Sequence, residues 1–416
     1  MLGRSLKEKK LLAYAVYFFP LLSIVEVNFL GRLSGADIGC LAIVAANVVQ
    51  PSIFFKNRFE LKFYMLAILW LLSLVLTDLY LGTPFEQYAR GWARVAFFII
   101  NFAAVRLLVG QSVVRAVDMI FVFFLAAAIK QALGIGEGAI AGSIFGSAWK
   151  FGYGQLFTFS ALWISSKLIL KSNRSALGVL APFAAAFVNL FLDARNLFGR
   201  ALLSALAVVI SVSTRRPFGF QTMIAVMAFG IIFGLASVSV YSVAASGGLL
   251  GKAAQEKYEN QTQGQFGILL GGRSEILASS QAVVDSPIIG HGSWARDKYY
   301  ATLLIQRLRN SGRDESEVVR DTLIPTHSYL MVAWVEAGIL GAVFWIWALW
   351  VCFRALYSAI QIHTAYAGIF VYVSISLVWG IFFSPFGLDQ RFVVALWLCL
   401  LSLVPGYGSG RTSKVD

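Results

Sequence analysis

The chain has 416 residues, of which 58% are hydrophobic and only 13% are charged, and its mean hydropathy is +0.74. A soluble domain carries about 45–50% apolar and about 25% charged residues, so this composition excludes a single soluble domain. The net charge of +13 does not indicate nucleic-acid binding, because no soluble basic domain is present to carry it. The composition predicts an all-α, polytopic membrane protein.

Apolar blocks recur along the chain with the length that a helix needs to cross the hydrocarbon core, about 20 residues. The first block follows a basic stretch but is too long for a signal peptide, so we expect it to be retained as a helix. About twelve transmembrane helices are predicted, over residues 11–30, 37–55, 62–82, 93–110, 117–134, 154–170, 176–193, 200–213, 219–243, 328–352, 364–384 and 392–406.

These helices divide the chain into three regions. Helices one to nine fill residues 1–243, a large polar loop covers residues 244–327, and helices ten to twelve fill residues 328–416. Short helices are expected within the loop over residues 274–284 and 301–308, with a break at residues 287–292. No internal repeat is visible, so the sequence does not favour an inverted-repeat transporter.

Lysine and arginine in the short connections set the predicted orientation. Most of them fall on one side, which the positive-inside rule assigns to the cytoplasm. Both termini are then cytoplasmic, and the large loop is external, which means periplasmic in a cell with two membranes. The connections assigned to the cytoplasm contain Arg4, Lys7, Lys9, Lys10, Lys56, Arg58, Arg115, Lys171, Arg174, Arg215, Arg216, Arg354, Arg411 and Lys414.

Arginine also occurs at the predicted external ends of the helices, where it works against the insertion signal. Each residue taken alone is explained by a lipid headgroup or by a nearby acid, as in the pairs Asp193 with Arg195, Glu275 with Arg273 and Asp389 with Arg391. As a set they favour a shared anionic ligand, because the planar guanidinium suits phosphate oxygens. The set is Arg90, Arg94, Arg195, Arg200, Arg273 and Arg391.

His327 is one of three histidines and stands where the large loop re-enters the membrane. Pro325 restricts the residue before it in the chain, and a helix is expected to start immediately afterwards. At a helix N-terminus His327 would lie beside an anion-attracting site and could take a proton in acid/base chemistry. The alternative is an interfacial histidine that only caps the helix.

Three further positions in this region are candidate supporting residues. Glu336 is predicted to lie two to three turns deeper in the span, where an acid is a functional candidate unless it forms a structural ion pair. His291 lies in a glycine turn of the loop, and Ser328 follows His327 directly. Gly338 and Gly341 are spaced for close helix packing.

The sequence gives no sign of a metal or a cofactor. No external Asp-x-Asp pair or cluster of histidine and carboxylates indicates a metal site, and no glycine loop with Lys-Ser or Lys-Thr indicates ATP hydrolysis. Cys40, Cys352 and Cys399 lie in or at the ends of apolar spans, where packing is the expected role.

Two spaced patterns resemble the O-antigen ligase and polymerase superfamily of bacterial envelope glycosyltransferases. Residues 273–277 match the pattern of Arg, three residues and Leu. Residues 327–341 match the pattern of His, a small polar residue, nine residues, Gly, two residues and Gly. Residues 285–292 also resemble the Pro-x-x-Gly-x-Gly turn of that family. The similarity covers about residues 190–345, and the N-terminal half matches only in hydropathy.

The resemblance implies an enzyme of the bacterial inner membrane that transfers a glycan from undecaprenyl diphosphate by an inverting, metal-independent reaction. In that scheme His327 deprotonates or orients the acceptor hydroxyl, and Arg273, with Arg195 or Arg200, holds the diphosphate. Arg391 and Arg90 are further candidate diphosphate ligands. The segment around Arg195 and Arg200 is looser than the usual one of the family, which leaves open which of the two binds phosphate.

Membrane lipids, the lipid-linked glycan and its acceptor are the expected partners. An O-antigen ligase, whose acceptor is lipid A-core, is favoured, and a polymerase that extends a glycan chain is the alternative. A transporter of a polyprenyl-linked anion would also need arginines, but along a path through the bilayer rather than at one face. A structural assembly subunit would not require His327.

Overall fold

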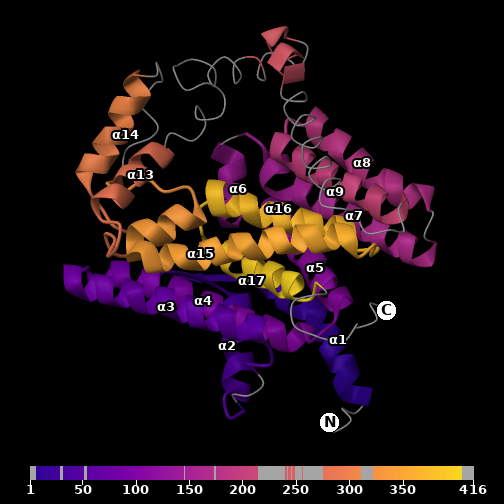
Figure 1. The fold of residues 1–416 in the computed structure, drawn as a ribbon, viewed down its shortest axis with the longest axis horizontal. Coiled ribbons are helices and arrows are strands. Elements are labelled where there is room, and N and C mark those ends of the chain that lie inside the picture. The colour runs from indigo at the N-terminus through magenta and orange to yellow at the C-terminus, as the bar shows by residue number, and fades with distance from the viewer. Residues whose placement is uncertain are drawn as a thin grey trace.

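The computed structural model describes residues 6–28, 31–50, 54–144, 146–172, 175–213, 275–310 and 322–404, with a few short stretches between 239 and 255. Within these residues the fold is all-α apart from one small hairpin (Figure 1). The helices are α1 (Leu6–Leu21), α2 (Gly35–Asn47), α3 (Arg58–Leu81), α4 (Phe85–Val109), α5 (Val113–Ala132), α6 (Gly136–Ile144), α7 (Gly154–Lys171), α8 (Ala176–Phe191), α9 (Arg195–Ser213), α13 (Glu275–Asp285), α14 (Lys298–Asn310), α15 (Tyr329–Gln361), α16 (Ala367–Phe383) and α17 (Leu388–Ser402).

The hairpin follows α1 and a 3₁₀ turn at Leu22–Ile24. Its strands β1 (Glu26–Asn28) and β2 (Arg32–Ser34) pair antiparallel, with Val27 opposite Leu33. Neither the hairpin nor the short α6 and the π-helical turn after it (Trp149–Tyr153) was predicted from the sequence.

Four helices are long and apolar enough to cross a membrane, judged by length and composition among the described residues: α3, α4, α9 and α15. Several others, including α2, α8 and α16, are apolar but shorter. Helices therefore occupy most predicted spans, but helix length does not confirm a count of twelve. The predicted span at 219–243 lies almost entirely outside the described residues.

Local sequence signals explain where these helices begin and end. Ser34 caps α2, and its hydroxyl and the Asp37 carboxylate form a reciprocal capping box. The side chain of Asn57 accepts a hydrogen bond from the Glu60 amide at the start of α3. Gly82 ends α3 with φ of 64°, a left-handed conformation in which glycine costs little.

Helix α15 breaks at Gly338, where φ is 65° and ψ is −162°. The chain folds back there, so that a Cβ at Gly341 would approach the Ala333 carbonyl oxygen to 2.3 Å. The rings of Tyr329 and Trp345, which a straight helix would separate by about 24 Å, have centroids 5.0 Å apart. The helix predicted over 328–352 is therefore present, but a break at Gly338 divides it.

The turn that precedes α14 fills the break in α15. The amides of His291 and Gly292 donate to the carbonyl oxygens of Val335 and Glu336 at 2.6 and 3.1 Å. The Ser73 hydroxyl of α3 donates to the Ala337 carbonyl oxygen at 2.7 Å. These donors satisfy carbonyl groups that the interrupted helix leaves without partners. We call the end of the bundle that carries this turn, α13 and α14 the loop end.

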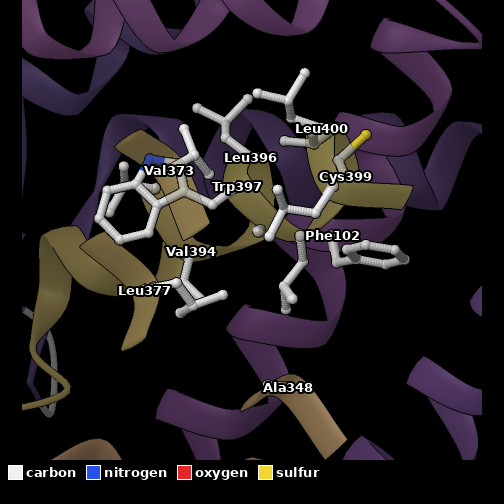
Figure 2. Close-up of a cluster of buried hydrophobic side chains, with 14 of the residues drawn as sticks. Phe102, Ala348, Val373, Leu377, Val394, Leu396, Trp397, Cys399 and Leu400 are labelled. Carbon is white, nitrogen blue, oxygen red and sulfur yellow. The ribbon is translucent and has the colours of Figure 1, made fainter. Parts of the chain in front are cut away.

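Helix α17 lies at the centre of the bundle. Its residues from Phe392 to Leu401 are all buried, as expected of a helix that is apolar all round. Figure 2 shows Trp397, Leu400 and neighbouring side chains packed with Phe102 of α4 and Leu377 of α16. Because α17 meets protein on every side, it does not have to match the membrane thickness by itself.

The helices end at different levels at the loop end. At the opposite end α4 and α17 are aligned, since Arg106 lies beside Cys399 three residues before each helix ends. Helix α4 has 25 residues and α17 has 15, so α4 extends about 15 Å further toward the loop end. Figure 1 shows α3 and α15 extending past α16 and α17 on the side of α13 and α14. The α16–α17 connection is therefore recessed.

Replacing Gly338 with alanine should destabilise the protein, because an added Cβ would lie 1.8 Å from the Ile288 carbonyl oxygen and φ is positive. We expect a loss of about 2 kcal/mol or more, seen as a lower Tm in detergent. The matched control is Gly199→Ala in α9, where a Cβ meets no atom within 4 Å. Equal Tm values for the two variants would contradict this account of the break.

Candidate functional site

The first polar cluster at the loop end joins the turn after α13 to α3, α4 and α15. Glu336 pairs with Arg94 of α4, and its Oε1 accepts from the Trp294 amide at 3.2 Å. Asp78 of α3 accepts from the Ser293 amide and hydroxyl at 2.7 and 2.6 Å. We call these five residues the loop clamp. Glu336 lies two residues before the break of α15, at the fold-back rather than within a continuous helix.

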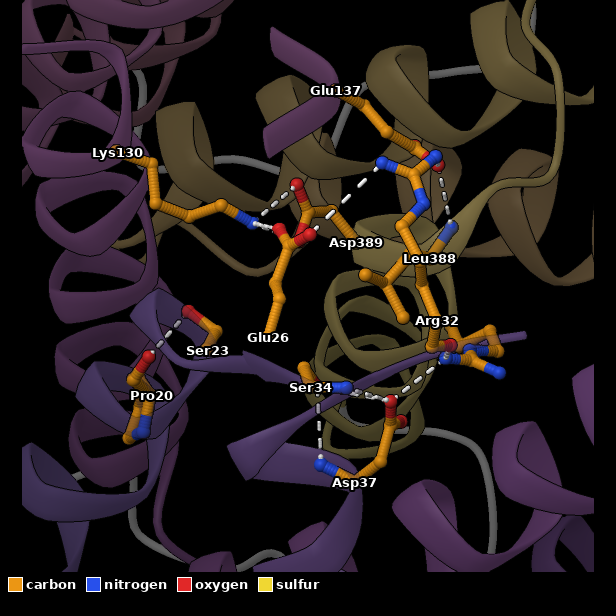
Figure 3. Close-up of polar contacts among 11 residues, drawn as sticks. Pro20, Ser23, Glu26, Arg32, Ser34, Asp37, Lys130, Glu137, Leu388 and Asp389 are labelled. Carbon is orange, nitrogen blue, oxygen red and sulfur yellow. Dashed lines mark hydrogen bonds and ion pairs between the residues drawn. The ribbon is translucent and has the colours of Figure 1, made fainter. Parts of the chain in front are cut away.

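A second cluster surrounds the recessed start of α17 (Figure 3). Lys130 at the end of α5 binds Glu26 at 2.6 Å and Asp389 at 2.8 Å. Arg32 of the hairpin reaches Glu137 of α6 at 2.8 Å. Burial, with Asp389 nearby, raises the pKa of Glu137 above its ordinary value. This cluster therefore ties the hairpin and α6 to the α16–α17 connection.

Arg391 belongs to this cluster and is not a free anion ligand. It donates to Asp37 at 2.8 Å and to the Arg32 carbonyl oxygen at 3.2 Å, and it is buried. The suggested ion pair between Asp389 and Arg391 is wrong, because side chains two residues apart on a helix do not face each other. The candidate role of Arg391 in binding diphosphate therefore finds no support, since its charge is already neutralised.

Arg200 of α9 has a different environment. Its Nη1 lies 3.4 Å from the Ser376 hydroxyl, and its guanidinium stands 5.8 Å from the centre of the Trp379 ring. Tyr329 and Tyr372 are close enough to interact electrostatically. Among the described residues no carboxylate pairs with it, and its buried Nε has no hydrogen-bond partner. A half-buried guanidinium in these surroundings can bind an anionic ligand.

Arg195 and Arg90 are less distinctive. Arg195 at the first position of α9 pairs with Asp193 at 3.6 Å, as the sequence suggested. Arg90 of α4 lies near the hairpin, where its Cγ would be 3.4 Å from a Cβ at Gly31, and it makes further contacts. Arg200 therefore differs from Arg195 and Arg90: it is half-buried, and no carboxylate pairs with it among the described residues.

His327 lies just before α15, two residues ahead of Tyr329, whose hydroxyl donates to Gln390 of α17 at 2.6 Å. Its side chain is 51% exposed, and its Nδ1 is 3.9 Å from Oε1 of Glu275. Ser328 is occupied structurally, since it caps α15 and donates to the Ile381 carbonyl oxygen at 2.6 Å. The imidazole is thus accessible, next to the recessed ends of α16 and α17.

Two candidate residues remain, His291 and Arg273. His291 bonds the Ala282 carbonyl oxygen through Nε2 at 2.8 Å, and its amide helps to fill the break in α15. Arg273 lies outside the described residues, although Glu275, its suggested partner, faces His327. The described residues include no group of three His, Cys, Asp or Glu side chains arranged to hold a metal.

Several residues at the loop end were not selected from the sequence. Lys130, Asp78 and Glu26 could have been suspected, since charged side chains near apolar spans are costly unless paired. Tyr329, Ser376 and Trp379 carry no such signal, because tyrosine, serine and tryptophan are ordinary residues of membrane helices. Only the fold shows that they surround Arg200.

Comparison with known proteins adds no family assignment, because no protein-family model and no curated protein sequence matches this chain. The similarity of residues 273–277 and 327–341 to O-antigen ligases therefore stays a sequence-based hypothesis.

The pair of Arg94 and Glu336 should be structural and mutually dependent. Because both side chains are buried, Arg94→Leu or Glu336→Leu alone leaves one charge uncompensated, with an expected loss of about 3–5 kcal/mol. The double variant should be more stable than either single variant, measured by Tm in detergent. Additive losses would show that the two residues act independently.

Proposed function

We propose that this protein is an integral-membrane glycosyltransferase that moves a glycan from undecaprenyl diphosphate to an acceptor hydroxyl. The observation that carries the proposal is Arg200, a half-buried cation without a described carboxylate partner, close to Tyr329. His327, an accessible imidazole, is two residues from Tyr329 in the chain. A cation and a proton acceptor in one region are what this transfer requires.

We propose that the glycan donor is lipid-linked, and the staggered ends of the helices support this. Helix α16 has 17 residues and measures about 26 Å, less than a hydrocarbon core of about 30 Å. The α16–α17 connection and the residues near it then lie below the membrane surface. A diphosphate attached to a polyprenyl chain could reach Arg200 from the bilayer without leaving it.

The reaction breaks the bond between the anomeric carbon and the diphosphate oxygen. A bond forms between that carbon and the acceptor oxygen on the opposite face, so the configuration inverts. His327 takes the proton of the acceptor hydroxyl, and undecaprenyl diphosphate leaves with the bonding electron pair. Arg200 binds the diphosphate more strongly as its negative charge grows, which lowers the barrier. Arg273 is expected to act with Arg200.

We further propose that the protein has about twelve spans in a bacterial inner membrane, with both termini in the cytoplasm and the loop end in the periplasm. The acceptor we favour is lipid A-core, which would make the protein an O-antigen ligase. A polymerase would share the donor and the chemistry and differ only in the acceptor.

His327→Ala should fold normally and lose about 10²–10⁴-fold in transfer rate, the usual contribution of a general base. The assay uses purified protein, a defined undecaprenyl-diphosphate glycan and EDTA, with lipid A-core or a second lipid-linked glycan as separate acceptors. Product on lipid A-core identifies a ligase, and a ladder of longer lipid-linked glycans identifies a polymerase. Unchanged transfer by His327→Ala would remove the proposed base. Donor movement across liposomes without product would instead indicate a transporter.

Arg200→Ala should reduce transfer by about 10²–10³-fold, as expected when a donor to a developing oxyanion is lost. Arg200→Lys should restore only part of the rate, because an ammonium group lacks the bidentate geometry of arginine. The comparison variant is Arg195→Ala, whose arginine already pairs with Asp193. A larger loss in Arg195→Ala than in Arg200→Ala would reverse the assignment of the diphosphate ligand.

A further inference from the structure

We infer that the end of α13 and the turn that follows it, residues 284–294, insert an apolar edge into the membrane interface beside α3. This turn belongs to the loop that the sequence assigns to water. The inference concerns how the loop is held at the bilayer, and it does not depend on glycan transfer.

The first observation is a lipid-facing stripe along α3. Apolar side chains recur on it every three or four residues, so they share one face of the helix. They are 44–66% exposed in the isolated chain, and the stripe continues to the last turn of the helix. Its members are Leu61, Met65, Ile68, Leu72, Leu76 and Leu79. In a helix long enough to span a membrane, such a face meets acyl chains.

The second observation is that the turn is fixed against the outer end of this helix. Thr77 of α3 donates to the Ile289 carbonyl oxygen at 2.7 Å, and Asp78 accepts two hydrogen bonds from Ser293. Thr77 is four residues before the end of α3 at Leu81, which corresponds to about 6 Å along the helix axis. The turn therefore lies at the depth of the last turn of a spanning helix.

The third observation is what the turn exposes there. Ile288 is 72% exposed and Val284 is 70% exposed, although both are aliphatic. Trp294 and Tyr80 are exposed at the same end of the bundle, and these two residue types concentrate at membrane interfaces. An exposed apolar edge that continues the stripe of α3 is best matched by the same partner, the lipid.

The positions of charged residues set how far residues 284–294 can insert into the membrane interface. From Ser286 to Trp294 the sequence contains no Asp, Glu, Lys or Arg. Asp285 receives a hydrogen bond from the Tyr300 hydroxyl at 2.7 Å, which holds its pKa below the ordinary value. A carboxylate that stays ionised has to remain in water or among headgroups, so Val284 and Asp285 mark the boundary.

The test is to place a fluorescent label at Ile288 in the full chain, reconstituted in lipid nanodiscs. Ile288→Cys is labelled with an environment-sensitive dye, and quenching is measured with iodide in water and with spin-labelled lipid. Leu76→Cys is the matched control for lipid and Lys298→Cys, exposed on α14, the control for water. The unsubstituted chain is the labelling blank, because its three cysteines are buried.

The label at position 288 should behave like that at position 76. We expect quenching by shallow spin-labelled lipid and iodide quenching several-fold weaker than at position 298. Strong iodide quenching without lipid quenching would overturn the inference, because the turn would then lie in water. Failure of both quenchers, together with disulfide formation between unlabelled Ile288→Cys chains, would also overturn it by placing a second copy on this surface. Because Ile288 is exposed, the substitution should leave folding intact, and a size-exclusion profile checks this.

Discussion

The break of α15 at Gly338 is the constraint on which the loop end of the molecule depends. A helix interrupted within a membrane protein leaves carbonyl groups without partners, and the turn around His291 supplies the missing amides. These backbone hydrogen bonds hold the turn against α3 and α15. They also position α13 and α14, which continue the chain at either end of the turn. The fold-back also brings Tyr329 into contact with Trp345 and keeps His327 next to α16 and α17.

The charged side chains at the loop end follow from the cost of burying an unpaired charge in a low-dielectric interior. Lys130, Arg94 and Arg391 all pair with carboxylates, each of them on another element of the fold. Against that background Arg200 stands apart, since its described neighbours are hydroxyl groups and an aromatic ring. Because Lys130, Arg94 and Arg391 already pair with carboxylates, Arg200 is the candidate to bind an external anion.

Helix length links this electrostatic pattern to the membrane. The short central helices α16 and α17 end before the longer α3 and α4 at the loop end, so the polar groups near their connection are recessed and enclosed by protein. The same long helix α3 carries a continuous lipid-facing stripe and holds the turn at residues 284–294. The arrangement puts a polar region and a lipid-facing edge at the same end of the bundle.

The sequence by itself determined the apolar, membrane-type composition, the helical content and the two short helices of the loop, because each follows from local composition and spacing. Only the tertiary structure decided how α15 folds back and which acid neutralises each arginine. The spacing of Gly338 and Gly341 predicted close helix packing, but the positive φ at Gly338 is a property of the backbone path. The partner of Arg391 is Asp37, more than 350 residues away in sequence. No local pattern encodes such a contact, since packing of distant helices creates it.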